Sequence, residues 1–355
     1  MNKISFPPKL LKKLFIFILI ANCSLLTINC SKKLDPEPLS LSVKQNLAML
    51  QADPQFVMYF DFKKMRETGF WNKFVSDSLI NSEKNFGNFL GLLKEATGVS
   101  VTNGIDELFF SNSWIGDNAM VVKGTFDKKR VDDYVSKDTL YKKLPYPNNI
   151  TVYKQSEVNF YFYFKDDFTV CASNYLKQVE STMSIADTSR TGLLTNDIAM
   201  KTIENIKYKD NLWMMSNQKL FIRGIFENFA DMNKKGTNPP VNEKDTTAVD
   251  TSNGMDLTSI YKKISSVSFA LKMSDDLDII MQNNCEDEKS ANDLKNRVEA
   301  IIALVKISST LSNKKPIAAM KVLDKIEINV FDKTVLLEAK LDEKSITEIR
   351  KQKLF

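Results

Sequence analysis

The sequence contains no histidine among its 355 residues. Histidine is the commonest general base and the commonest metal ligand in proteins. Its absence excludes Ser-His-Asp and Cys-His catalysis, and every zinc site that needs an imidazole ligand. No segment has the spacing of a calcium-binding loop either. We therefore expect a protein that is not an enzyme and that holds neither a cofactor nor a metal.

Cysteine is scarce as well. Of the four cysteines, Cys23 and Cys30 lie in the N-terminal apolar segment, which leaves Cys171 and Cys285. Two are too few for a zinc cluster or a disulfide scaffold. Cys171 and Cys285 could form one disulfide in an oxidising compartment, or stay as separate free thiols. A bridge needs Cα atoms within about 7 Å of each other, and the sequence does not give this distance. Both alternatives are therefore open.

The N-terminal segment has the three parts of an export signal. A basic start is followed by an apolar core over residues 14–28, and the sequence turns polar after Cys30. This layout is typical of a secretory signal peptide. The apolar core is shorter than the ~20 residues that a membrane-spanning helix needs. We therefore assign residues 1–29 to a signal peptide and expect export.

The end of this signal, Leu26-Thr27-Ile28-Asn29-Cys30, resembles the signal of bacterial lipoproteins. In that family an apolar residue and two small residues precede an obligatory cysteine, which receives a diacylglycerol and becomes the first mature residue. Asn29 is larger than the usual residue there. Cys23 is a rival, but only Cys30 is followed by polar sequence. The resemblance implies a lipid anchor on Cys30 and a place in the cell envelope, and Ser31 after it implies the outer membrane.

The positive charge of the chain belongs largely to the signal. The formal net charge is +5, from 49 basic and 44 acidic residues. Four lysines and no acidic residue precede Cys30, so their removal leaves 45 basic residues and a net charge of +1. Nucleic-acid binding needs a basic domain or stripe. We therefore expect no nucleic-acid partner, and a membrane contact through Cys30 with an envelope protein or lipid as further partner.

After a polar, Pro-containing tether over residues 30–42, two regions follow, 43–187 and 195–355. Each region reads as strand, helix, hairpin, helix, hairpin and helix, so that a duplication of one ancestral unit is an open alternative. Adjacent hairpins with helices between them predict an α+β fold with antiparallel sheets. Residues 233–256 are polar, contain no aromatic side chain, and are expected to form a mobile surface insertion.

Several individual elements can be placed from alternation and turn residues. We expect a strand at 56–62, another at 212–215, and a loop at 144–149, where two prolines and two asparagines gather. Three hairpins are predicted from paired apolar runs around short polar turns. They pair residues 107–114 with 118–126, 264–273 with 277–282, and 326–331 with 334–341.

The aromatic run at residues 159–164 is a candidate binding surface. Period-two alternation places three phenylalanines on one face and Tyr161 and Tyr163 on the other. The phenylalanines should face the core. Tyrosine combines an apolar ring with a polar tip, which suits a ligand surface. The alternative is that helices of the same region cover the two tyrosines.

Residues 259–262 contain a possible catalytic serine motif. Ser259-Ile260-Tyr261-Lys262 resembles the S-x-x-K motif of penicillin-binding proteins and class A β-lactamases, in which Lys262 would help to activate Ser259. Asp276 and Val335 depart from the Asn and Gly of that family's other two motifs. We therefore favour a non-catalytic binding or structural module, with lipid, peptide or glycan binding on a sheet face or in a cleft as the alternative.

Overall fold

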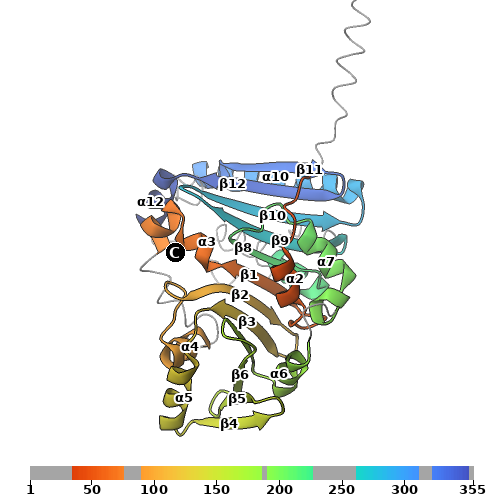
Figure 1. Cartoon of the computed structure of the whole chain (residues 1–355). Coiled ribbons are helices and arrows are strands. Elements are labelled where there is room, and N and C mark those ends of the chain that lie inside the picture. The colour runs from red at the N-terminus through yellow and green to blue at the C-terminus, as the bar shows by residue number, and fades with distance from the viewer. Residues whose placement is uncertain (1–33, 76–88, 186–189, 227–260, 312–321, 352–355) are drawn as a thin grey trace, which may run out of the picture. The chain divides into compact units, whose positions relative to one another are not determined.

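The computed structural model describes residues 34–75, 89–185, 190–226, 261–311 and 322–351. The described residues from 35 to 351 form one compact unit. Within it the described strands form a single twelve-stranded sheet, in the order β11-β12-β10-β9-β8-β1-β2-β3-β7-β6-β5-β4 (Figure 1). Every pair of neighbouring strands is antiparallel. The predicted antiparallel α+β fold is confirmed.

The strands are β1 (Phe56–Asp61), β2 (Ile105–Asn112), β3 (Asn118–Gly124), β4 (Tyr141–Tyr146), β5 (Ile150–Gln155), β6 (Phe160–Phe164), β7 (Thr169–Ser173), β8 (Leu212–Ser216), β9 (Ile264–Met273), β10 (Leu277–Cys285), β11 (Ile326–Phe331) and β12 (Thr334–Leu341). The helices are α2 (Leu41–Leu47), α3 (Phe62–Arg66), α4 (Phe89–Thr97), α5 (Lys128–Lys137), α6 (Leu176–Met183), α7 (Asp197–Glu204), α10 (Glu288–Leu311) and α12 (Glu343–Lys351), with short π and 3-10 turns at Trp71–Val75 and Gly192–Thr195.

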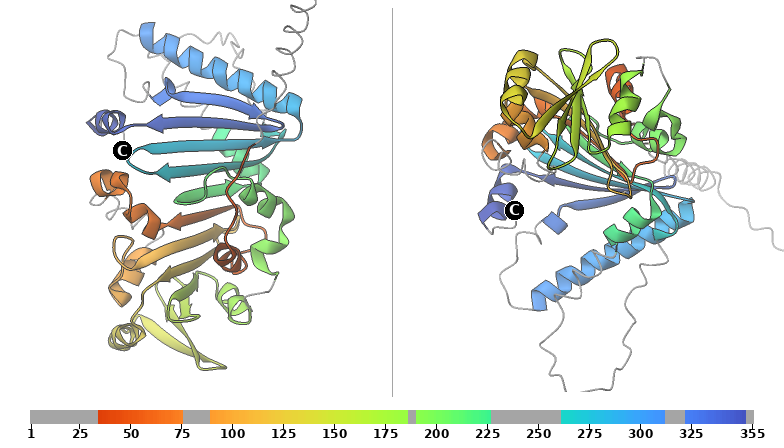
Figure 2. Two further views of the ribbon diagram at one scale, coloured as in Figure 1. Left: turned by 45° about the horizontal axis from the view of Figure 1, so that its top comes forward. Right: turned by 90° about the horizontal axis from the view of Figure 1, so that it is seen from below.

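Helices cover both faces of the sheet, so its strands carry apolar residues in both directions. On the face that we call face A, Phe60, Leu108 and Phe162 pack in one core with α3, α4, α5 and α12. The opposite face, face B, carries Tyr59 and Tyr163 and is covered by α2, α6 and α7. Figure 2 shows α10, in blue, on the other side of the sheet from α2 and α7.

The two predicted regions meet where β1 pairs with β8, with Met58 opposite Met214. Both have the same connectivity. Each begins with a helix and a three-stranded meander, β1-β2-β3 or β8-β9-β10, and a helix, α5 or α10, follows the third strand. The last strand, β7 or β12, then returns to pair with that third strand. The regions are therefore two halves of one sheet in one compact unit, with β4 and β5 added in the first half.

The three predicted hairpins are confirmed by the pairings of β2 with β3, β9 with β10 and β11 with β12. The predicted loop at 144–149 is wrong in its first part, because β4 runs through Pro145, which pairs with Thr151. Strand β4 lies at the edge of the sheet. Proline is tolerated on an edge strand, since its missing N–H can face solvent.

The predicted tether is partly bound to the folded unit. Residues 34–40 have no regular secondary structure, and α2 begins at Leu41 with Ser40 as its cap. The backbone N–H of Lys209 donates to Glu37 Oε2 at 2.8 Å, and the buried Lys209 ammonium donates to the carbonyls of Glu37 and of Ile206. Burial lowers the pKa of Lys209 to about 8. Glu37 therefore fixes this segment against the residues that precede β8.

Candidate functional site

Tyr163 does not offer a ligand surface. Its side chain is buried beneath α6, and its hydroxyl lies 3.0 Å from the Thr182 hydroxyl. Burial raises the pKa of Tyr163. Tyr161, on the same face, is half-buried, and the Lys154 ammonium lies 5.5 Å from its ring centroid. The alternation was interpreted correctly, but a helix of the same half covers most of the tyrosine face.

Cys171 and Cys285 are both free and buried. They lie on β7 and β10, which are six strand positions apart in the sheet. At about 4.8 Å per strand this places them roughly 30 Å apart, far beyond the reach of a disulfide. Burial raises the pKa of each thiol to about 11, which disfavours the reactive thiolate. The disulfide alternative is therefore excluded.

The described residues do not bring the three parts of the serine motif, at residues 259–262, 274–276 and 333–335, together into one site. Ser259 lies outside them, as do Cys23, Cys30, the predicted signal and the insertion at 233–256. The turn at Ser274 joins β9 to β10, whereas Lys333 lies beside the other end of β10, where its carbonyl accepts from the Cys285 N–H at 2.8 Å. The nine residues of β10 separate these two turns by about 26 Å. Within the same ranges no group of three acidic or thiol ligands could hold a metal ion.

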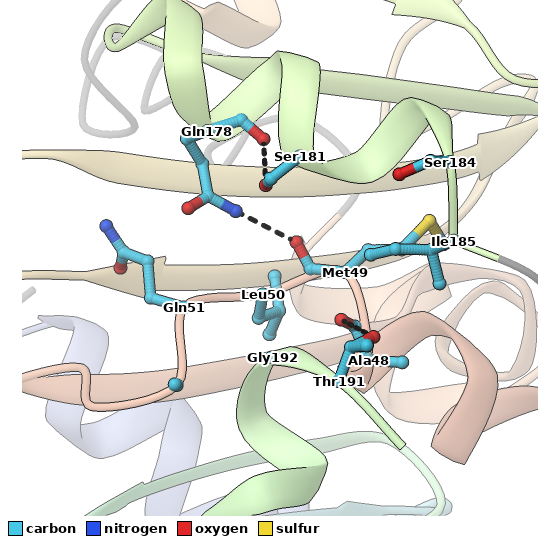
Figure 3. A pocket seen from close by; sticks show the side chains of 11 residues that line it. Ala48, Met49, Leu50, Gln51, Gln178, Ser181, Ser184, Ile185, Thr191 and Gly192 are labelled. Atoms are coloured by element: carbon cyan, nitrogen blue, oxygen red, sulfur yellow. Dashed lines mark hydrogen bonds between the residues drawn. The ribbon is translucent and has the colours of Figure 1, made fainter. Parts of the chain in front are cut away.

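A shallow pocket of about 350 Å³ lies on face B of the first half (Figure 3). Its walls are the segment 48–52 after α2, one side of α6 with the two residues that follow this helix, and residues 191–192. The lining side chains are all uncharged: Ala48, Met49, Leu50, Gln51, Ala52, Gln178, Ser181, Ser184, Ile185, Thr191 and Gly192. The lining thus combines amide and hydroxyl groups with aliphatic side chains.

Hydrogen bonds to backbone carbonyls fix two of the pocket walls. The Gln178 side-chain amide donates to the Met49 carbonyl at 3.1 Å, and the Thr191 hydroxyl donates to the Ala48 carbonyl at 3.3 Å. Gly192 has a φ of +50°, and a Cβ at this position would lie 2.3 Å from the carbonyl oxygens of both Ala48 and Leu50. Only glycine permits this close approach of the two chain segments.

The remaining wall is joined to the sheet. The Gln51 amide donates to the Asp117 carbonyl at 2.9 Å, and its side-chain oxygen accepts from the Ser111 hydroxyl at 3.0 Å. Met49 contacts Cys171 through their sulfur atoms at 3.6 Å. Among the described residues, no hydrogen bond engages the Ser184 hydroxyl. The pocket therefore combines a rigid frame with a free polar group, and no sequence motif marks it.

A second polar cluster lies on face B near the junction of the halves. The Tyr59 hydroxyl donates to Glu107 Oε1 at 2.6 Å and lies 3.4 Å from Asp61 Oδ2. Burial raises the pKa of both carboxyl groups, and the Lys64 ammonium, 3.7 Å from Asp61, opposes this for Asp61. One hydroxyl proton thus lies between the buried Asp61 and the half-buried Glu107. The Asp61 side chain also accepts from the Lys64 N–H at 2.8 Å, at the start of α3, so we interpret the cluster as structural.

No protein-family model matches this sequence, and no curated protein matches it either. Two solved structures to which the chain is similar carry the titles "Structure of crystal form I of TP0453" and "Structure of crystal form III of TP0453". The first has a TM-score of 0.47 and 9% identity, and covers 86% of this chain and 96% of that one. The second has a TM-score of 0.44 and 9% identity, covering 86% and 97%. The function must therefore be argued from the site itself.

Proposed function

We propose that this chain is an exported protein, anchored in the bacterial envelope by lipid on Cys30, that acts by binding and not by catalysis. The pocket on face B is its ligand site. The observation that carries this proposal is the uncharged lining of the pocket within a frame fixed by Gln178, Thr191 and Gly192. The absence of histidine from the sequence supports the non-catalytic part.

The anchor follows from the N-terminal pattern. Acyl chains contribute about 0.8 kcal/mol per buried CH₂, so that two or three chains on Cys30 would hold the protein stably at the bilayer. The segment bound to the folded unit includes Glu37. Between Cys30 and Glu37 the chain spans at most about 25 Å. The folded unit would therefore work close to the membrane. In the described ranges no helix is both long and apolar enough to cross a bilayer.

The lining of the pocket limits the chemistry of its ligand. Burying a charged group without a partner is strongly unfavourable, and none of the lining side chains carries a charge. A ligand with hydroxyl or amide groups can bond to the Ser184 hydroxyl while its carbon atoms contact Met49 and Ile185. The volume of about 350 Å³ suits a small ligand or one unit of a longer one. We therefore propose a neutral glycan unit as the ligand class.

A panel of neutral and N-acetylated sugars, each paired with its uronic acid, tests the pocket. At least one neutral sugar should bind, as measured by isothermal titration calorimetry, and its uronic acid should bind at least tenfold more weakly. Ser184→Trp should abolish binding by filling the pocket. Ser136→Trp is the matched control, because Ser136 lies exposed on α5. Failure of every neutral sugar to bind, or binding that survives in Ser184→Trp, would exclude the pocket as a glycan site.

The anchor has a separate test. Cys30→Ala should leave an unprocessed precursor that carries no added lipid, whereas Cys23→Ala should be processed and lipidated normally. Labelled palmitate and the size of the chain on a gel report both properties. The reverse pattern would move the anchor to Cys23, and normal processing of both variants would refute a lipid anchor in this segment.

A further inference from the structure

The turn between β2 and β3 exposes two large apolar side chains side by side. Trp114 is 48% exposed and Ile115 is 84% exposed. Exposing such side chains to water is unfavourable, and a contiguous apolar patch on a protein surface commonly marks an interaction site. The turn sequence Ser-Trp-Ile-Gly-Asp contains no basic residue. Any contact that it makes would therefore be driven by apolar burial.

The turn itself is ordered. The Ser113 N–H donates to the Asp117 carbonyl at 2.8 Å, and the Gly116 N–H donates to the Ser113 carbonyl at 3.1 Å. Gly116 has a φ of +86°, and a Cβ there would meet no atom within 4 Å, so the turn projects into open space. The two apolar side chains are thus presented by a fixed backbone.

A third exposed side chain lies at the same end of the sheet. Asn174, which follows β7, donates to the Gly116 carbonyl at 2.9 Å and accepts from the Asn118 N–H at 2.7 Å. The next residue, Tyr175, is also exposed. These bonds hold Tyr175 at the same end of the sheet as the turn. We call Trp114, Ile115 and Tyr175 together the Trp114 patch.

We propose that the Trp114 patch inserts into the interfacial layer of the bilayer to which the chain is anchored. Tryptophan and tyrosine are enriched at membrane interfaces, where their rings lie at the level of the headgroups. Three side chains are too few for a stable protein interface, which buries about 800 Å² on each partner. A lipid anchor raises the effective concentration of the patch at the bilayer, so a weak contact suffices.

The contact sets the orientation of the molecule. Because Gln51 of the pocket wall bonds to Asp117 of the same turn, the pocket lies at the end of the sheet that carries the patch. Insertion of Trp114 would hold this end at the membrane. The proposal builds on membrane anchoring, so its test supplies the anchor chemically and does not depend on natural lipidation of Cys30.

The experiment uses the chain from Cys30 onward, coupled through Cys30 to a maleimide lipid in phosphatidylcholine vesicles. Cys171 and Cys285 are buried, and their thiol pKa values are raised, so maleimide selects Cys30. The chain has three tryptophans, and Trp71 and Trp213 are buried. Tryptophan emission in vesicles with brominated acyl chains, compared with plain vesicles, therefore reports contact of Trp114 with lipid.

We expect emission to fall in brominated vesicles, and the fall to vanish in Trp114→Phe. Ile115→Ser should reduce it at least twofold. Phe168→Ser is the matched control, because Phe168 is 60% exposed in the turn at the opposite end of β7, and it should leave the quenching unchanged. Equal emission in the two kinds of vesicle, or quenching that persists in Trp114→Phe, would overturn the proposal.

Discussion

The two halves of the sheet share a connectivity but differ in where their last helix packs. In the first half α6 follows β7 and covers face B, where Thr182 meets Tyr163. In the second half α12 follows β12, and its Ile346 and Ile349 join the core on face A. One helix thus crosses to the other face of the sheet between otherwise similar halves. The pocket described above lies where α6 packs on face B.

The chemistry of face B differs accordingly. In the first half it carries Phe109, Val121 and Cys171, all buried. In the second half buried apolar residues, Trp213 and Ile280, are joined by polar groups that the segment at 205–209 covers. Gln282 accepts from the Lys207 N–H at 2.6 Å, and the Lys207 ammonium pairs with Glu338 at 2.7 Å. A repeated connectivity therefore does not imply a repeated site, because the site depends on which helix covers the sheet.

The largest predicted effect concerns the junction of the halves. Trp213 on β8 is fully buried and lies opposite Tyr59 on β1, with ring centroids 5.5 Å apart. Trp213→Ala should lower the free energy of unfolding by about 3–5 kcal/mol. Because both halves share one sheet, we expect one cooperative urea transition by circular dichroism and by fluorescence. Two separated transitions would show that the halves fold independently. Trp114→Ala, at the exposed turn, should change stability by less than about 0.5 kcal/mol.

The next effect concerns the pocket wall of the first half. Gly192→Ala should destabilise the protein by about 1–3 kcal/mol, because the backbone conformation is strained for alanine and the Cβ meets two carbonyl oxygens. Gly91→Ala in α4 is a control with the opposite sign. A Cβ at Gly91 meets no atom within 4 Å, and alanine is the better helix former by about 0.5–1 kcal/mol. The melting temperatures of both variants test these two predictions. Equal shifts of the melting temperature would contradict the close approach at Gly192.

A smaller effect tests the contact between α6 and face B. Tyr163→Phe removes one buried hydroxyl while Thr182 still donates to the Val179 carbonyl at 2.7 Å. We expect the free energy of unfolding, measured in urea, to fall by about 1 kcal/mol. Tyr161→Phe should be close to neutral, since no hydrogen bond of its hydroxyl is found in the described structure. A larger loss for Tyr161→Phe than for Tyr163→Phe would reverse our assignment of the covered tyrosine.

The smallest effect is pH-dependent and concerns the acids beside the junction. Burial raises the pKa of Glu107 above its usual 4.5 in the folded state. Folding therefore favours the protonated form, and this contribution is present below pH 4.5 and is lost as the pH rises through the folded-state pKa. Glu107→Gln can still accept from Tyr59 without a charge. Relative to the wild type, the free energy of unfolding of Glu107→Gln should increase by up to about 1 kcal/mol between pH 4 and pH 7. A relative loss over this range, in urea unfolding, would contradict the assignment.

Local patterns predicted much of the fold. Alternating apolar residues around short turns were sufficient to predict the three hairpins. Two of these hairpins form the second and third strands of the meanders in the two halves. The pairing of β1 with β8 was not predicted, because a contact between residues more than 150 positions apart leaves no local signal. Strand β4 was missed because Pro145 was interpreted as a loop residue, although an edge strand tolerates it.

The sequence predicted less of the candidate site than of the fold. Alternation placed Tyr161 and Tyr163 on one face correctly, but it could not show that α6 would cover that face. The pocket depends on backbone carbonyls of Ala48, Met49 and Leu50, which every residue possesses and no motif reveals. Gly192 has the positive φ that the close approach of two distant segments requires, but a single glycine in the sequence does not show which segment it meets.

Mass spectrometry of the mature N-terminus tests the central claim most directly. The protein, extracted from bacterial membranes, should begin at Cys30 and carry a thioether-linked diacylglycerol, with an amide-linked acyl chain on its α-amino group. Peptides containing Cys171 and Cys285 should have unmodified thiols, as their burial requires. A mature chain that begins at another residue, or one that retains an unmodified Cys30, would contradict the account of a lipid-anchored binding protein.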